Sequence, residues 1–66
     1  MEHYVIHNHD GQCAIYHNGD YIGHHAVPDL LRHIAQLGRQ ATIFYVDHGC
    51  LLPLATIANG SITYGD

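Results

Sequence analysis

The sequence predicts a small α+β domain, in which one helix packs on one face of a small antiparallel sheet. The expected chain order is three strands, one helix and three further strands, with the last strands short. Asn-Gly and Asp-Gly pairs separate short β-rich runs in both halves of the chain, and such pairs favour two-residue hairpin turns. Between the halves, the apolar residues change to the period of an amphipathic helix. A chain of 66 residues has room for a single compact domain, residues 1–66, with one core.

The first half of the chain is typical of a three-stranded meander. The predicted strands are "HYVIHNH" (3–9), "QCAIYH" (12–17) and "DYIGH" (20–24). The pairs Asp10-Gly11 and Asn18-Gly19 lie between them, and both central residues of such turns adopt positive φ.

The segment "VPDLLRHIAQLGRQ" predicts a helix of about three turns. Pro28 suits the first helical position, where no N–H donor is needed, and Asp29 favours the positive end of the helix dipole. Gly38 is a natural left-handed helix stop. The apolar stripe of this helix consists of Leu30, Leu31, Ile34, Ala35 and Leu37.

Three strands are predicted after the helix. They are "ATIFYVD" (41–47), "CLLPLATIA" (50–58) and "SITY" (61–64), with the last two joined at Asn59-Gly60. Because Pro53 cannot donate a hydrogen bond to a ladder, we expect its strand to lie at an edge, to be bulged, or to break there.

Tight turns fix the strand register, so side-chain alternation assigns each residue to a face of the sheet. The face beneath the helix is expected to form the core, with contributions from both halves: Tyr4, Ile6, Cys13, Ile15, Ile22, Phe44, Val46, Leu51, Pro53, Ala55, Ile57, Ile62 and Tyr64. The opposite face is expected to carry His3, Val5, His7, His9, Ala14, Tyr16, Tyr21, His25, Ile43, Tyr45, Asp47, Cys50, Leu52 and Leu54.

The uncovered face is predicted to bind a partner. A solvated sheet face normally alternates to polar residues, whereas this one is apolar and rich in tyrosine, which is enriched at protein interfaces. The predicted partner-binding residues are Val5, His7, Tyr16, Tyr21, Tyr45, Leu52 and Leu54. Two alternatives are that the sheet curls and buries part of this face itself, or that Pro53 shifts the register.

The histidines do not form a recognisable metal or catalytic motif. If a metal site exists, its ligands are expected to be His7, His9 and His25, but structural zinc needs four close ligands. Cys13 is expected opposite His24, both toward the core, where a packed and inert cysteine is the usual role. The sequence therefore predicts no catalytic residues and no cofactor.

The charge composition of the chain disfavours nucleic acid as a partner. The chain has two Arg, no Lys and a formal net charge of −4 with neutral histidine, so direct binding to nucleic acid is not expected. Protonation of all eight histidines would reverse this sign, since imidazole titrates near pH 6.5. No apolar run is long enough for a membrane span, and Glu2 and His3 occupy the place of a basic signal-peptide region. We therefore expect a cytoplasmic protein.

These observations predict a non-enzymatic protein that sterically inhibits a larger host protein or ribonucleoprotein. In size and in its lack of catalytic equipment, the chain is similar in kind to small phage-encoded inhibitors, including anti-CRISPR proteins. The alternatives are a histidine-based metal-binding module and an antitoxin-like regulatory subunit. Homodimerisation through an exposed strand edge is a further expectation that the sequence leaves open.

Overall fold

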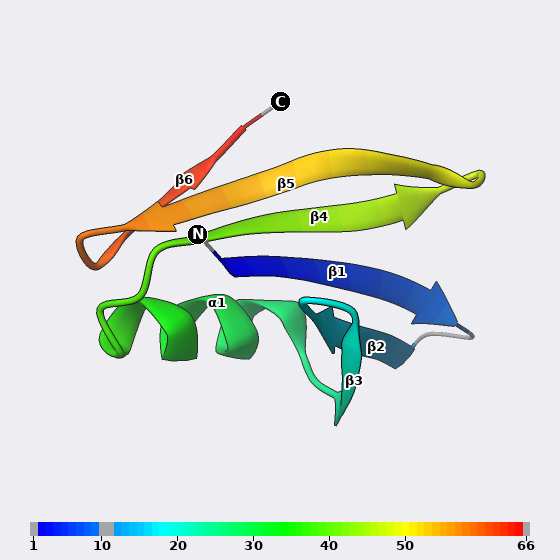
Figure 1. Ribbon diagram of the computed structural model, residues 1–66, viewed down its shortest axis with the longest axis horizontal. Coiled ribbons are helices and arrows are strands. Elements are labelled where there is room, and N and C mark those ends of the chain that lie inside the picture. The colour runs from blue at the N-terminus through cyan, green and yellow to red at the C-terminus, as the bar shows by residue number, and fades with distance from the viewer. Residues whose placement is uncertain (1, 10–11, 66) are drawn as a thin grey trace.

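The computed structural model describes residues 2–9 and 12–65, with His9 and Gln12 described by their backbone only, and contains one six-stranded sheet and one helix (Figure 1). The elements are β1 (Glu2–His9), β2 (Gln12–His17), β3 (Asp20–His24), α1 (Val27–Gln36), β4 (Ala41–Asp47), β5 (Cys50–Ala58) and β6 (Ser61–Tyr64). The strands lie in the order β3-β2-β1-β4-β5-β6. The predicted α+β class is therefore confirmed.

The sheet is mixed, and the prediction of an antiparallel sheet is wrong at its centre. β1 pairs with β4 in parallel, with Tyr4 beside Ile43, whereas the other neighbouring strands are antiparallel. The reason is the helix between β3 and β4, because parallel neighbours need a long crossover connection. The chain passes through α1 and re-enters the sheet on the free side of β1 (Figure 1).

The hairpin turns follow the sequence signals. Asn18-Gly19, His48-Gly49 and Asn59-Gly60 all have positive φ at both residues, as the hairpin turn between twisted strands requires. The predicted turn at Asp10-Gly11 lies outside the described residues.

The helix begins and ends where the sequence predicts. Pro28 lies in its first turn together with Asp29. Gly38 has a φ of +72° and donates its N–H to the carbonyl of Ala35, which terminates the helix. Leu30, Leu31 and Ile34 are buried, so these members of the predicted apolar stripe form the inner side of α1, whereas Leu37 is 54% exposed.

The core lies between α1 and one face of the sheet, which we call the helix face. Its largest fully buried side chains come from four elements: Ile15, Leu31, Ile34, Ile43 and Ile57. Tyr4, Ile6, Ala41, Ala55 and Leu30 complete the buried cluster. Helix and sheet thus share one continuous core.

A bulge next to Pro53 reverses the predicted faces of β4 and of the part of β5 that precedes the bulge. Ile43 opposes Ala55, but its neighbour Phe44 opposes Pro53, so Leu54 is an extra residue in β5. Proline cannot donate to the ladder, and a bulge tolerates this. The predicted faces are therefore wrong here, because Ile43 is fully buried in the core while Phe44 and Pro53 lie on the opposite face. Val46 and Leu51 oppose each other two residues farther along each strand, so they share the face of Phe44 and Pro53 and do not lie in the predicted core.

A second bulge lies between β2 and β3. Tyr16 opposes Tyr21, but Ile15 opposes Gly23, so Ile22 is the extra residue and is 42% exposed. Gly23 has a φ of +111°, a conformation that glycine adopts readily. The shift places His24 opposite Ala14, and the predicted pairing of Cys13 with His24 is wrong.

Truncation of Ile43 tests the corrected face assignment. We expect Ile43→Ala to lower the free energy of unfolding by about 2–5 kcal/mol, because a fully buried side chain leaves a cavity. Leu51→Ala, at a side chain that is 59% exposed, should change it by less than about 0.5 kcal/mol. Urea denaturation followed by circular dichroism measures both values. Equal effects of the two substitutions would contradict the assignment.

Candidate functional site

The sheet face opposite α1, which we call the open face, is the first candidate site. No helix covers it among residues 2–9 and 12–65. Strand register arranges its side chains in rows that cross the strands. The middle row crosses five strands, from β3 to β5, and consists of Tyr21, Tyr16, Val5, Phe44 and Pro53. At a spacing of about 4.8 Å between strands, this row extends over roughly 19 Å.

Two further rows flank the middle row. On one side, the register aligns polar side chains across β1, β4, β5 and β6: His3, Thr42, Thr56 and Thr63. On the other side it aligns His24, Ala14 and His7, with Val46 opposite Leu51 farther along. The open face is thus apolar and aromatic in its centre and edged by threonine and histidine.

Ring contacts connect these rows. His7 meets Tyr16 edge-on with ring centroids 5.1 Å apart, and Tyr16 lies 5.5 Å from Tyr21. The hydroxyl of Tyr21 is 2.6 Å from Nδ1 of His24, within hydrogen-bond distance. These contacts hold the exposed rings in defined positions, because each ring restricts the rotation of the next. Ala14, which lies between His7 and His24 in the register, is buried.

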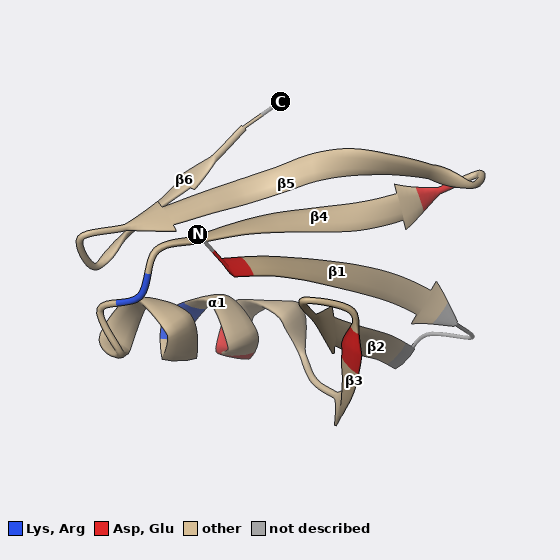
Figure 2. Cartoon of the chain, viewed as in Figure 1, with Lys and Arg blue, Asp and Glu red and all other residues tan. Residues whose placement is uncertain are grey.

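In the part of the chain that the structure describes, the open face carries no fixed charge. Within the described ranges, no Asp, Glu, Lys or Arg occupies a strand position on this face. Figure 2 shows the charged residues on α1, on the loop after it and at strand ends. Arg32 pairs with Asp29 and Arg39 pairs with Glu2, so both arginines belong to the helix side.

Four of the predicted partner-binding residues lie on the open face, namely Val5, His7, Tyr16 and Tyr21. Tyr45, Leu52 and Leu54 do not lie there. Tyr45 and Leu54 pack against the core, and Leu52 opposes Tyr45 across the β4–β5 ladder. The bulge next to Pro53 is the physical reason, because it reverses the alternation that the prediction assumed to continue.

Several members of the open face were not predicted from the sequence. They are Phe44, Val46, Leu51 and Pro53, which were assigned to the core, and His24, which was placed opposite Cys13. The one sequence signal for this change is Pro53, which favours a bulge or a register shift in its strand. For His24 the signal was Gly23, since an isolated glycine in a strand is typical of a bulge.

A groove on the helix side is the second candidate site. It has a volume of about 580 Å³ and lies between α1 and the β3 edge. Apolar side chains of Ile22, Leu30, Ile34 and Leu37 line it together with Tyr4, and the polar lining consists of His25, Asp29, His33 and Arg39. His25 therefore lies on the helix side, whereas the sequence placed it with His7 on the opposite face.

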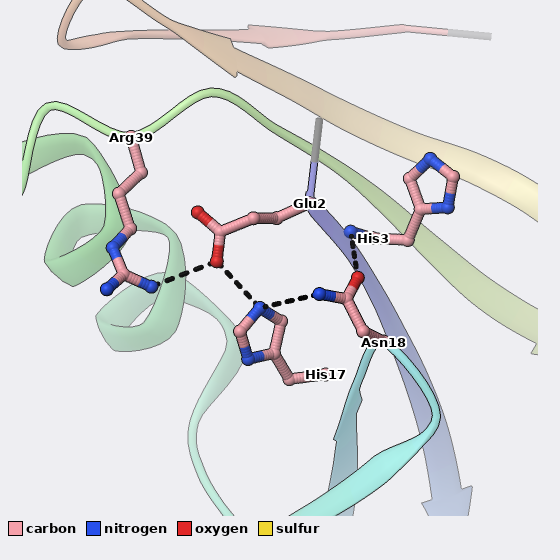
Figure 3. A network of polar contacts seen from close by, with 5 residues as sticks. All are labelled: Glu2, His3, His17, Asn18 and Arg39. Atoms are coloured by element: carbon pink, nitrogen blue, oxygen red, sulfur yellow. Dashed lines mark hydrogen bonds and ion pairs between the residues drawn. The ribbon is translucent and has the colours of Figure 1, made fainter.

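A polar network shares Arg39 with the lining of this groove (Figure 3). One carboxylate oxygen of Glu2 accepts a hydrogen bond from Arg39 at 2.9 Å and lies 2.6 Å from Nε2 of His17. The side-chain amide nitrogen of Asn18 lies 3.4 Å from the same Nε2. The His17 ring also stacks on Tyr4, with centroids 4.4 Å apart.

This network fastens the start of β1 to the rest of the fold. Asn18 accepts a hydrogen bond from the backbone N–H of His3 at 2.9 Å and donates its own backbone N–H to the His3 carbonyl. Glu2 donates its N–H to the carbonyl of Gln40. The contacts join β1, the β2–β3 turn and the loop after α1, which makes the role of Glu2 and His17 structural.

A metal centre has little support in this arrangement. In the part of the chain that the structure describes, no three His, Cys, Asp or Glu side chains gather closely enough to hold an ion. Of the proposed ligands, His7 lies on the open face and His25 on the helix side, and the side chain of His9 lies outside the description. Cys13 and Cys50 are free thiols rather than a disulfide.

Comparisons with protein-family models, with curated proteins and with solved structures gave no match to this chain. Among the described residues, no helix has the length and apolar character that crossing a bilayer requires. The geometry of the two candidate sites is therefore the basis for the function proposed for this chain.

Substitution of Glu2 tests the structural role of the network. We expect Glu2→Gln to lower the free energy of unfolding by about 0.5–1 kcal/mol, since it weakens partly exposed pairs with both His17 and Arg39. The difference from wild type should shrink in about 1 M NaCl, because salt screens these charges. The control is Arg32→Gln, whose more exposed pair with Asp29 spans 3.5 Å and should contribute close to nothing. A larger loss in the control would overturn this role.

Metal analysis tests the alternative based on histidine. Protein purified without an affinity tag or a metal column should contain no stoichiometric zinc, because His7 and His25 lie on opposite sides of the sheet. Elemental analysis of the purified chain measures the content. One zinc per chain, lost in His7→Ala, would establish the metal site instead.

Proposed function

We propose that this chain is a non-enzymatic binding protein that attaches to a larger protein or ribonucleoprotein through its open face and inhibits it sterically. The observation that supports the proposal is the uncharged aromatic and apolar row that crosses five strands, from Tyr21 to Pro53. Large exposed apolar patches on small domains mark interaction sites, and the centres of interfaces are depleted in charge.

The exposure of individual side chains supports the same use of this face. Tyr21 is 51% exposed and Leu51 is 59% exposed, although both have large apolar surfaces. Tyrosine is among the residue types that contribute most to binding when a partner covers them. Tyr16, Val5 and Phe44 are only half-buried and lie between these two, so a partner would meet a continuous surface.

The ring contacts favour binding without large rearrangement. Tyr21 is already held by Tyr16 and by the nitrogen of His24, and Tyr16 is held by His7. Ordering side chains on association costs about 0.5–1.5 kcal/mol for each flexible group, and a surface that is ordered beforehand avoids part of this cost. Such a face suits a binder better than a solvated sheet face would.

The charge distribution favours a protein surface as the contact. Phosphate backbones are recognised by Lys and Arg, but both arginines of this chain pair with acids on the helix side. We propose that a ribonucleoprotein partner would be met through its protein component. The resemblance in kind to phage-encoded inhibitors, including anti-CRISPR proteins, makes host defence machinery the class of target to examine first.

The groove on the helix side favours no second function. Its lining residues Leu30 and Ile34 belong to the core packing of α1, and Arg39 is paired with Glu2. An antitoxin-like subunit would also bind a protein partner, and the gene beside this one in its genome separates the two proposals.

Alanine substitution of the two neighbouring tyrosines tests the proposed face. Once a partner has been captured from the native host and purified, Tyr16→Ala and Tyr21→Ala should each weaken binding at least about 30-fold, as removal of a central aromatic anchor does. Calorimetry measures the affinities, and circular dichroism verifies that each variant is folded.

The matched control is Tyr64→Ala. Tyr64 is a tyrosine of similar exposure, 64%, but the register places it on the helix face opposite Ala55. Its substitution should leave the affinity unchanged. The proposal fails if Tyr16→Ala and Tyr21→Ala bind as wild type, or if all three variants lose binding equally.

A further inference from the structure

The outer edge of β6 pairs with no other strand among the residues that the structure describes. β6 ends the sheet beside β5, and its sequence Ser61-Ile62-Thr63-Tyr64 contains no charge and no proline. β-branched and aromatic residues favour extended structure, and Tyr64 is 64% exposed. Proteins normally protect such edges with charge, proline or bulges, because exposed edges pair with other chains.

The hydrogen-bond pattern shows which backbone groups this edge offers. Ala58 opposes Ser61 across the two-residue turn, so these two form a hydrogen-bonded pair, and such pairs alternate along an antiparallel ladder. Beyond Tyr64, Gly65 donates its N–H to the Leu54 carbonyl, as this alternation requires. The N–H and C=O groups of Ile62 and Tyr64 therefore point away from β5.

The opposite edge of the sheet, β3, is built differently. Its strand begins with Asp20, and a bulge at Ile22 interrupts its pairing with β2. Gly23, with a φ of +111°, turns the backbone out of the regular strand conformation. These are the devices that disfavour edge-to-edge pairing. Of the two edges, β6 is the one that can accept another strand in regular register.

We propose that two copies of this chain pair through β6, antiparallel, about a two-fold axis at Thr63. In this register Ile62 of one copy forms a hydrogen-bonded pair with Tyr64 of the other, and the two copies of Thr63 oppose each other. Aliphatic–aromatic and Thr–Thr pairs are favourable cross-strand neighbours, and no like charges meet. The strand is thus complementary to itself, which favours a second copy over an unrelated peptide.

The pairing joins two six-stranded sheets into one continuous sheet with both open faces on the same side. It also covers the exposed ring of Tyr64 with Ile62 of the other copy. Because four-residue strands bury little area, we expect a weak dimer, with a dissociation constant roughly in the sub-millimolar range. This proposal is independent of the proposed function, since β6 forms no part of the aromatic row.

Opposite charges at Thr63 provide the decisive experiment. Sedimentation equilibrium of the full chain from about 10 µM to about 1 mM should show concentration-dependent dimerisation. Thr63→Lys and Thr63→Glu each place like charges across the axis and should weaken the dimer at least about fivefold. An equimolar mixture of the two variants should restore association, which damage to the fold could not produce. Thr63 is exposed, so circular dichroism should show both variants folded.

Amide hydrogen exchange locates the contact. Exchange at Ile62 and Tyr64 should slow at high protein concentration, because these N–H groups gain partners only in the dimer. Tyr64→Pro removes an outward N–H without removing a β5–β6 hydrogen bond, and it should weaken association at least about tenfold. A chain that is monomeric at about 1 mM overturns the proposal, as does association unchanged by all three substitutions, which would place the interface elsewhere or on the open face.

Discussion

The packing of α1 on the sheet gives one shared core to the two halves of the chain, which meet along the β1–β4 ladder. Leu31 and Ile34 are each 1% exposed and belong to the same cluster as Ile15 from the first half and Ile43 and Ile57 from the second. Because this helix also connects β3 to β4, it brings β4 alongside β1 and sets their parallel pairing. A ten-residue helix can cover only one side of six strands, and the open face follows from that limit.

Local structure could be predicted from the sequence because the signals for it are local. The helix from Val27 to Gln36 follows from its apolar period, Pro28 and Gly38, and the hairpins follow from Asn-Gly pairs. The common face of Tyr16 and Tyr21, on either side of the Asn18-Gly19 turn, was also predicted. In each case the information lies within a few residues of the feature that it determines.

The faces of the strands were harder to predict because one inserted residue reverses every assignment beyond it. Leu54 is such a residue, and it moved Phe44 to the open face and Tyr45 to the helix face. Pro53 indicated that the ladder would be disturbed, but not which residue would be inserted. That choice depends on the parallel neighbour β1, which places Ile43 beside Tyr4 in the core, and this long-range contact has no local signal.

The two bulges have a common consequence for the surface of the protein. Without the bulge in β5, Tyr45 and Leu54 would lie on the open face, and Phe44 and Pro53 would be covered by the helix. Without the bulge in β3, His24 would leave the side of Tyr21, with which it makes its 2.6 Å contact. The bulges thus select which aromatic and imidazole groups are presented together. A partner that binds the open face would recognise this selection, and straightening either strand would change recognition while the core residues Ile15 and Ile57 kept their places.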